Sequence, residues 1–135
     1  MTIRLRIAAA ISAFVAIAAA PAVSQHVELG MLDQLQSGNW EIRQRGSDNR
    51  VERLCLSDGR RLIQLRHRHP NCARQVVSDE ASEVAVQYTC PGHGYGLTRI
   101  RRETDKLVQI DSQGVVNGQP FSFSAEGRRV GDCAS

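Results

Sequence analysis

Apolar and polar residues alternate along most of the chain after residue 38, which is the pattern of β-strands with one buried and one exposed face. Gly, Asn, Asp and Pro residues interrupt this alternation at short intervals, as expected of tight turns. Because the strands do not alternate with long helices, the sequence predicts an all-β domain, an antiparallel meander that forms a partly closed barrel or a sandwich. The seven predicted strands cover residues 39–45, 50–56, 72–78, 83–90, 95–102 and 106–116, and a last segment that ends near residue 130.

Two segments break the strand pattern and predict short helical elements. Residues 27–37 place apolar side chains four positions apart, on one face of a short N-terminal helix that ends at Ser37 and Gly38. Residues 57–65 predict one helical turn, for which Ser57 provides the N-cap.

Asn117 and Gly118 give the clearest local signal, because both residue types accept the positive φ angles of a type I′ hairpin turn. A hairpin centred on these two residues fixes the register of the strands on either side. In that register each larger side chain covers a smaller one across the strands, which favours packing. The predicted pairs are Phe121 with Gly114, Phe123 with Ser112, and Ala125 with Ile110.

The N-terminal segment predicts export from the cytoplasm. Two arginines in the first six residues precede an apolar run over residues 7–20, and small residues follow it. This succession is typical of a secretory signal peptide, and cleavage after Ala22 or after Ser24 fits equally well. We therefore expect residues 1–24 to be a signal peptide and residues 25–135 to form a single domain.

The charge balance excludes one class of function. The formal net charge is +3 for the whole chain and falls to +1 without the two arginines of the predicted signal peptide. A nearly neutral domain lacks the basic field that favours binding to nucleic acid or to anionic membranes. We therefore expect a periplasmic or secreted protein with no nucleic-acid partner and no stable membrane anchor after cleavage.

Four cysteines in an exported chain predict two disulfides, and their number alone permits three pairings. The strand register chooses among them. A turn centred on Ala81 places Cys72 opposite Cys90, within disulfide reach of each other on adjacent antiparallel strands. The sequence therefore predicts a Cys72–Cys90 disulfide, which leaves Cys55 to pair with Cys133.

Three histidines give this region a second interpretation, as a metal site. His67 and His69 stand just before Cys72, and His93 follows Cys90, so the predicted disulfide would bring the three histidines together. Imidazole is a frequent zinc or copper ligand, although histidines in a loop flanked by arginines are usually solvated. We expect no cofactor, and we keep His67, His69 and His93 as the candidate ligands of a metal ion.

The sequence contains no motif of a known enzyme class, so we expect no enzymatic activity. The glycines of residues 91–96 lack the lysine of a phosphate-binding loop, and no Gly-x-Ser-x-Gly motif is present. We expect a binding or structural accessory module with an envelope partner or a small ligand. As an alternative, a cupped sheet could carry a small apolar ligand. The candidate lining residues for that alternative are Trp40, Tyr88, Tyr95, Phe121 and Phe123.

Several short motifs resemble one family of small exported bacterial proteins, the domain of unknown function 3617 family. The motifs are Gly38-x-Trp40-Glu41, Val51-x3-Cys55-Leu56, Cys72, Tyr88-x-Cys90 and the terminal sequence GRRVGDC that ends at Cys133. The resemblance implies a secreted or periplasmic β-rich protein with a signal peptide, and it implies no activity or catalytic residue. The arginines and histidines of residues 60–70 and the scarcity of methionine depart from the family pattern.

Overall fold

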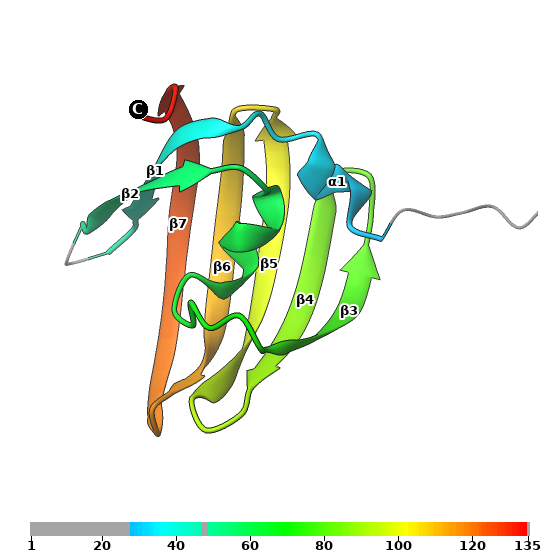
Figure 1. Cartoon of the computed structure of the whole chain (residues 1–135), viewed down its shortest axis with the longest axis vertical. Helices are drawn as coiled ribbons and strands as arrows, with labels where there is room; N and C mark the ends of the chain where they lie inside the picture. Colours follow the sequence, from blue (N-terminus) through cyan, green and yellow to red (C-terminus); the bar gives the residue numbers. More distant parts are fainter. Residues whose placement is uncertain (1–27, 47–48, 135) are drawn as a thin grey trace, which may run out of the picture.

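The computed structural model describes residues 28–46 and 49–134, in which seven antiparallel strands form one sheet (Figure 1). The predicted all-β fold is therefore confirmed, whereas the predicted signal peptide, residues 1–24, lies outside the described residues. The elements are, in chain order, helix α1 Gly30–Asp33, strands β1 Gly38–Gln44 and β2 Val51–Leu56, the 3-10 helix η1 Gly59–Gln64, and strands β3 Ala73–Asp79, β4 Glu83–Cys90, β5 Gly94–Thr104, β6 Leu107–Val116 and β7 Gln119–Gly131.

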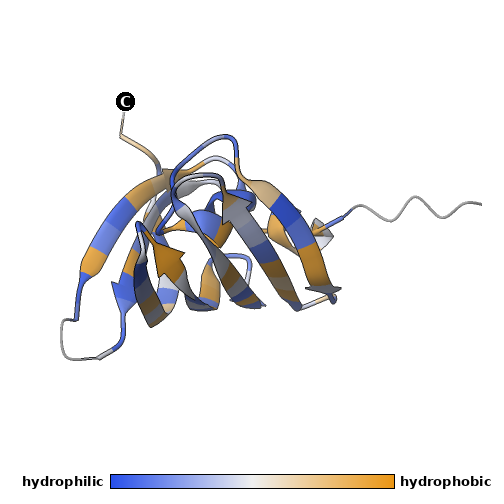
Figure 2. Ribbon diagram, turned by 90° about the horizontal axis from the view of Figure 1, so that it is seen from below, coloured by the Kyte–Doolittle hydropathy of each residue, from blue (hydrophilic) through white to orange (hydrophobic). Residues whose placement is uncertain are grey.

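The sheet is strongly curled but open, so it is neither a closed barrel nor a sandwich. Its strands lie in the order β2-β1-β7-β6-β5-β4-β3, which leaves β2 and β3 as the two edges. Strands β3 to β7 form a meander, and β1 then pairs with β7, for example Ile42 opposite Gly127. The sheet arches around α1 and η1, which lie on its concave face (Figures 1 and 2).

The hairpin between β6 and β7 has the predicted register. Asn117 and Gly118 have φ angles of 49° and 78°, which are the positive values that a type I′ turn requires. Phe121 lies opposite Gly114, Phe123 opposite Ser112, and Ala125 opposite Ile110, as the sequence predicts.

The register of β3 and β4 is also as predicted, except near their connecting turn. Val76 lies opposite Val86, but a bulge between Val76 and Ser78 then places Ser78 opposite Ala85. The turn is therefore not centred on Ala81. The bulge lies between Val76 and the turn, so the strand pairing between Val76 and the cysteines keeps the predicted register.

Both helical elements differ from their predicted forms. Helix α1 has only four residues. It cannot begin earlier than Gly30, because the preceding residue, Leu29, has a φ angle of 61° in the left-handed region. The second element is a 3-10 helix rather than an α-helical turn. Its N-cap is Asp58 and not the predicted Ser57, because the Asp58 carboxylate accepts the backbone N–H of Arg60 at 2.9 Å. No helix in the described part of the chain is long and apolar enough to cross a membrane.

A single hydrophobic core lies between the concave face of the sheet and the two helices. Inward-facing residues from the strands pack against Leu32 of α1 and against Leu62 and Ile63 of η1. Hydrophobic and hydrophilic residues alternate along the strands in Figure 2, so the convex face is left mainly polar. The fully buried large side chains of this core are Trp40, Tyr88, Leu32, Ile42, Leu56, Leu62, Ile63, Ile100, Ile110, His67, Val84 and Val86.

Candidate functional site

The structure contains two disulfides, and each one fastens an edge of the sheet. Cys72 immediately precedes edge strand β3 and bonds to Cys90 at the end of β4, with a Cα–Cα distance of 4.2 Å. Cys55 of the other edge strand, β2, bonds to Cys133 just beyond β7, with a Cα–Cα distance of 5.4 Å. These are the pairs expected from the strand register.

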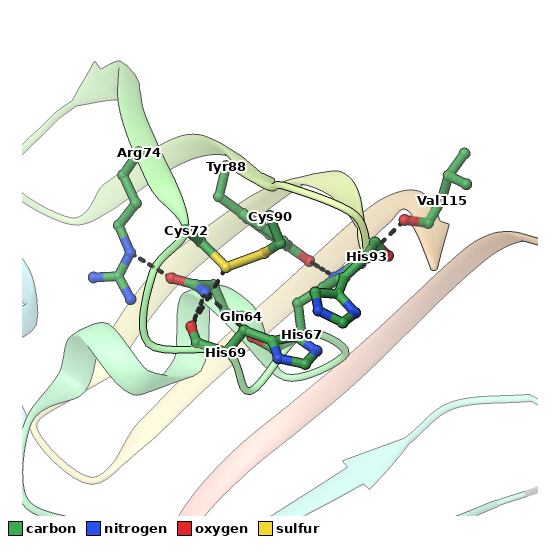
Figure 3. Close-up of a disulfide and its surroundings, with 9 residues drawn as sticks. All are labelled: Gln64, His67, His69, Cys72, Arg74, Tyr88, Cys90, His93 and Val115. Carbon is green, nitrogen blue, oxygen red and sulfur yellow. Dashed lines mark hydrogen bonds between the residues drawn. A yellow bond between two sulfur atoms is a disulfide. The ribbon is translucent and has the colours of Figure 1, made fainter. Parts of the chain in front are cut away.

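His67 lies in the loop between η1 and β3 and is only 1% exposed, in contrast to the solvated position expected of a histidine in a polar loop. Its Nε2 lies 3.1 Å from both the His93 and Val115 carbonyl oxygens, so Nε2 carries a proton and donates to them. Its Nδ1 lies 3.0 Å from the Tyr88 hydroxyl, which donates to it in this tautomer (Figure 3). Both ring nitrogens of His67 are therefore engaged with the protein.

Two glycines of the segment that follows Cys90 make room for this histidine. A Cβ atom at Gly94 would overlap the Val115 carbonyl and lie 3.0 Å from the His67 Nε2 atom. A Cβ atom at Gly96 would overlap the Tyr88 hydroxyl and lie 2.6 Å from the Tyr88 Cζ atom. The glycine-rich character of this segment is thus explained by the packing of His67 and Tyr88.

A buried polar network connects η1 to the concave face of the sheet. The Thr98 hydroxyl donates to the Ile63 carbonyl at 2.7 Å and lies 2.8 Å from the Ser112 hydroxyl. Burial raises the pKa of the Tyr88 phenol, and this effect outweighs a hydrogen bond with Ser112 and the charge of Arg66, which act in the opposite direction. Tyr88 therefore stays neutral and serves as a hydrogen-bond donor.

The other two histidines lie at the surface beside the Cys72–Cys90 disulfide. The rings of His69 and His93 are stacked, with centroids 3.7 Å apart and an interplanar angle of 14° (Figure 3). The structure thus brings the three predicted metal ligands into one region, but His67 would have to give up Tyr88 or the two carbonyls to bind an ion. Within residues 28–46 and 49–134, no group of three or more His, Cys, Asp or Glu side chains could hold a metal ion.

The five aromatic residues predicted to line an apolar cavity are divided between the core and the surface. Trp40 and Tyr88 are buried in the core, and the Trp40 indole N–H donates to the Gln36 carbonyl at 2.9 Å. Tyr95 is 50% exposed on the convex face, whereas Phe121 and Phe123 are half-buried on the concave side. Trp40 and Tyr88 therefore stabilise the core, whereas Tyr95 and Phe121 line a surface pocket.

A surface cleft of about 290 Å³ lies where η1 and the loop to β3 meet the edge strands, and we call it the arginine cleft. Its charged and polar lining consists of Arg61, Arg68, Arg74, His69, Gln64 and His67. Leu54, Leu65 and Pro70 supply its apolar lining. The sequence interpretation did not find this cleft, although residues 60–74 contain five arginines and no acidic residue, which was a usable signal.

Gln64 holds the arginine cleft in shape. Its side chain is 7% exposed, and its Nε2 donates to the carbonyl oxygens of His67 at 3.2 Å and His69 at 3.4 Å. Its Oε1 accepts the Nε–H of Arg74 at 2.6 Å (Figure 3). The Gln64 side-chain amide therefore fixes both the loop between η1 and β3, which forms one wall of the cleft, and the side chain of Arg74 on β3.

The charges around the cleft do not cancel. Arg68 forms an ion pair with Glu52, and Arg61 donates to the Cys55 carbonyl. Arg74 has no carboxylate within 4.0 Å among the described residues. Its partial burial lowers the pKa of the Arg74 guanidinium, although the charge of Asp58 acts in the opposite direction. The cleft therefore has a net positive charge.

Comparison with known proteins identifies the family to which the chain belongs. No curated protein matches the sequence, and no solved structure matches the fold. One family model matches residues 35–133, which include all seven strands, η1 and the four cysteines. The chain therefore belongs to the family described as protein of unknown function (DUF3617).

Proposed function

We propose that this chain is an exported, non-catalytic binding module that takes a small ligand in the arginine cleft. The observation that supports the proposal most directly is the cleft itself, because it combines volume, charge and an apolar wall in one place. Small-molecule sites are concave, mostly apolar and contain a few fixed polar groups, and a volume of about 300 Å³ lies at the lower end of their usual range.

The state of the reactive side chains supports a non-catalytic role. His67, Tyr88 and Ser112 are the buried groups nearest to an acid–base set, and their hydrogen bonds go to one another, to the Thr98 hydroxyl and to backbone carbonyls. A general base must reach the proton that it removes from a substrate. These groups instead hold η1 and its following loop against the sheet.

The two disulfides support export to the periplasm or the medium. Disulfides form and persist in oxidising compartments, and each of these two fastens an edge strand of the sheet. The predicted signal peptide agrees with this location.

Native mass spectrometry of the protein purified from the envelope of cells that produce it tests the proposal. We expect a bound species with a mass on the order of a few hundred daltons, the size that such a site accommodates. Pro70→Trp places an indole in the cleft and should abolish the bound species.

The matched control is Pro120→Trp, because Pro120 is exposed on the convex face, away from the cleft. This variant should retain the bound species. A wild-type spectrum without any bound species would contradict the proposal, and so would a species that is lost from Pro120→Trp but kept by Pro70→Trp.

A further inference from the structure

We infer that the ligand of the arginine cleft carries an anionic group, a carboxylate or a phosphate, on a short apolar chain. This inference rests on the proposed binding function and specifies the chemistry of the ligand.

Several arginines of the convex face pair with carboxylates. Arg43 contacts Glu41 at 2.7 Å, and Arg99 contacts Glu83 at 2.6 Å, so these charges are neutralised by neighbours on the sheet. Arg74 on edge strand β3 differs, because its one described side-chain partner is the neutral Gln64 and its nearest acid interaction is the more distant charge of Asp58. An arginine whose Nε–H is held by a neutral amide and that lacks a carboxylate partner has a positive charge that an anion can neutralise.

The orientation of Arg74 suits such an anion. Gln64 engages the Nε–H, so the two terminal nitrogens of the guanidinium remain available, and Figure 3 shows them directed away from Gln64. Four N–H groups in one plane match the two oxygens of a carboxylate or of a phosphate. Because the Nε–H is already held, the guanidinium is oriented before a ligand arrives, which lowers the entropic cost of binding.

The remaining cleft residues define the rest of the ligand. Arg61 and Arg68 also line the cleft and add positive charge, and Glu52 forms an ion pair with Arg68 alone. Leu54 and Leu65 are partly buried against the core and present apolar surface at the cleft. A fully hydrophilic anion would leave this apolar surface exposed to water, whereas a short alkyl chain would bury it.

Isothermal titration calorimetry with four probes tests the inference on the oxidised protein. The probes are octanoate, octyl phosphate, 1-octanol and inorganic phosphate. We expect octanoate and octyl phosphate to bind at least tenfold more tightly than 1-octanol, which lacks the charge, and than inorganic phosphate, which lacks the chain. The tighter of the two amphiphiles identifies a carboxylate or a phosphate as the preferred head group.

Arg74→Gln removes the charge and should weaken octanoate and octyl phosphate about tenfold. The matched control is Arg101→Gln, which removes the same charge from an exposed position on the convex face, where Arg101 pairs with Glu103 at 3.4 Å. It should change the affinity less than twofold. Equal thermal unfolding midpoints for the two variants ensure that the comparison concerns binding and not folding.

The outcomes separate this inference from the proposed function. If 1-octanol binds as tightly as octanoate, or if Arg74→Gln and Arg101→Gln bind the probes with equal affinity, the inference of an anionic ligand is wrong. The proposed binding of a ligand in the cleft is not contradicted by either result. If no probe binds but native mass spectrometry finds a species that Pro70→Trp removes, the ligand class is again wrong and the binding function stands. If neither experiment finds a ligand, both are overturned.

Discussion

At the scale of single residues, His67 shows how a polar side chain can be a core residue. Its ring is buried between β4 and the ends of β5 and β6, and it connects the Tyr88 hydroxyl to the backbone carbonyls of His93 and Val115. A buried polar group without a hydrogen bond costs about 1–3 kcal/mol. The histidine therefore has a structural reason for its presence, independent of any metal or catalysis.

Replacement of His67 should destabilise the fold in proportion to the hydrogen bonds that are lost. His67→Phe removes the acceptor of the Tyr88 hydroxyl and the donor to two backbone carbonyls, and should lower the free energy of unfolding by roughly 3 kcal/mol. His67→Gln retains a donor near the Nε2 position, so it should cost about 1 kcal/mol less. Urea denaturation of the oxidised protein measures both. His69→Phe, at an exposed position, is the control and should change stability by less than about 0.5 kcal/mol.

Gly96 should be intolerant of even one methyl group. Gly96→Ala would drive its Cβ into the Tyr88 ring, which cannot move because the core and His67 fix it on all sides. We expect a loss of about 1–3 kcal/mol in the free energy of unfolding. Gly131→Ala is the matched control, because no atom lies within 4 Å of its Cβ position and its φ angle is not in the left-handed region. Equal stabilities of the two variants would contradict this packing argument.

At the scale of elements, an ion pair fastens the two helices that cover the concave face. Both terminal nitrogens of Arg60 on η1 contact the Asp33 carboxylate at the end of α1, and one also donates to the Glu28 carbonyl at 3.0 Å. The hydrogen bond from Arg60 lowers the pKa of the Asp33 carboxyl in the folded state. The bridge therefore links the N-terminal segment to the rest of the fold.

This shift predicts a pH-dependent contribution to stability. Because the folded pKa of Asp33 lies below its unfolded value of about 4, the contribution is present above that pH and is lost as the pH falls through the folded pKa. Asp33→Asn should therefore be less stable than the wild-type protein at pH 6, and the difference should vanish near pH 2. Urea denaturation at both pH values measures it. Glu103→Gln, whose ion pair lies within β5 and links no separate elements, is the control at pH 6 and should change stability by less than about 0.5 kcal/mol.

The sequence allowed the local pairings of the sheet to be predicted, because each rests on a short-range cause. Asn117 and Gly118 determine one hairpin through their φ angles, and the alternation around Val76 and Val86 determines another. The pairing of β1 with β7 joins residues about 90 positions apart and has no such local signal. For this reason the curl of the sheet, and hence the choice of an open sheet over a barrel or sandwich, could not be derived.

The candidate site was less accessible to sequence reasoning, since its residues act through distant partners. The pattern around His67 resembles a solvated loop, and its burial depends on groups at positions 88, 93 and 115. Arg74 lies in the predicted strand of residues 72–78, where no sequence motif distinguishes it. Its role follows from Gln64, which lies ten residues earlier in a helix whose position the strand pattern does not specify.

At the scale of the whole molecule, the two disulfides should differ in their effect on stability. Cys55–Cys133 spans 78 residues and Cys72–Cys90 spans 18, so the first restricts the unfolded chain more. Removal of the first by paired substitution with alanine should cost about 4 kcal/mol, and removal of the second about 3 kcal/mol. Urea denaturation of each double variant, with the other disulfide intact, measures the costs. A larger loss from the shorter span would show that local packing outweighs chain entropy.

The open edges of the sheet give these disulfides one further consequence. A sheet that does not close exposes unpaired backbone N–H and C=O groups on its outer strands, and such strands can recruit other chains into fibrils or swapped assemblies. Here each outer strand is tied to the body of the protein by a covalent bond, and one of them also has a bulge beside the exposed Val77. Oxidation thus prevents the outer strands from peeling away. The same protein kept reduced would be both less stable and prone to assemble edge to edge.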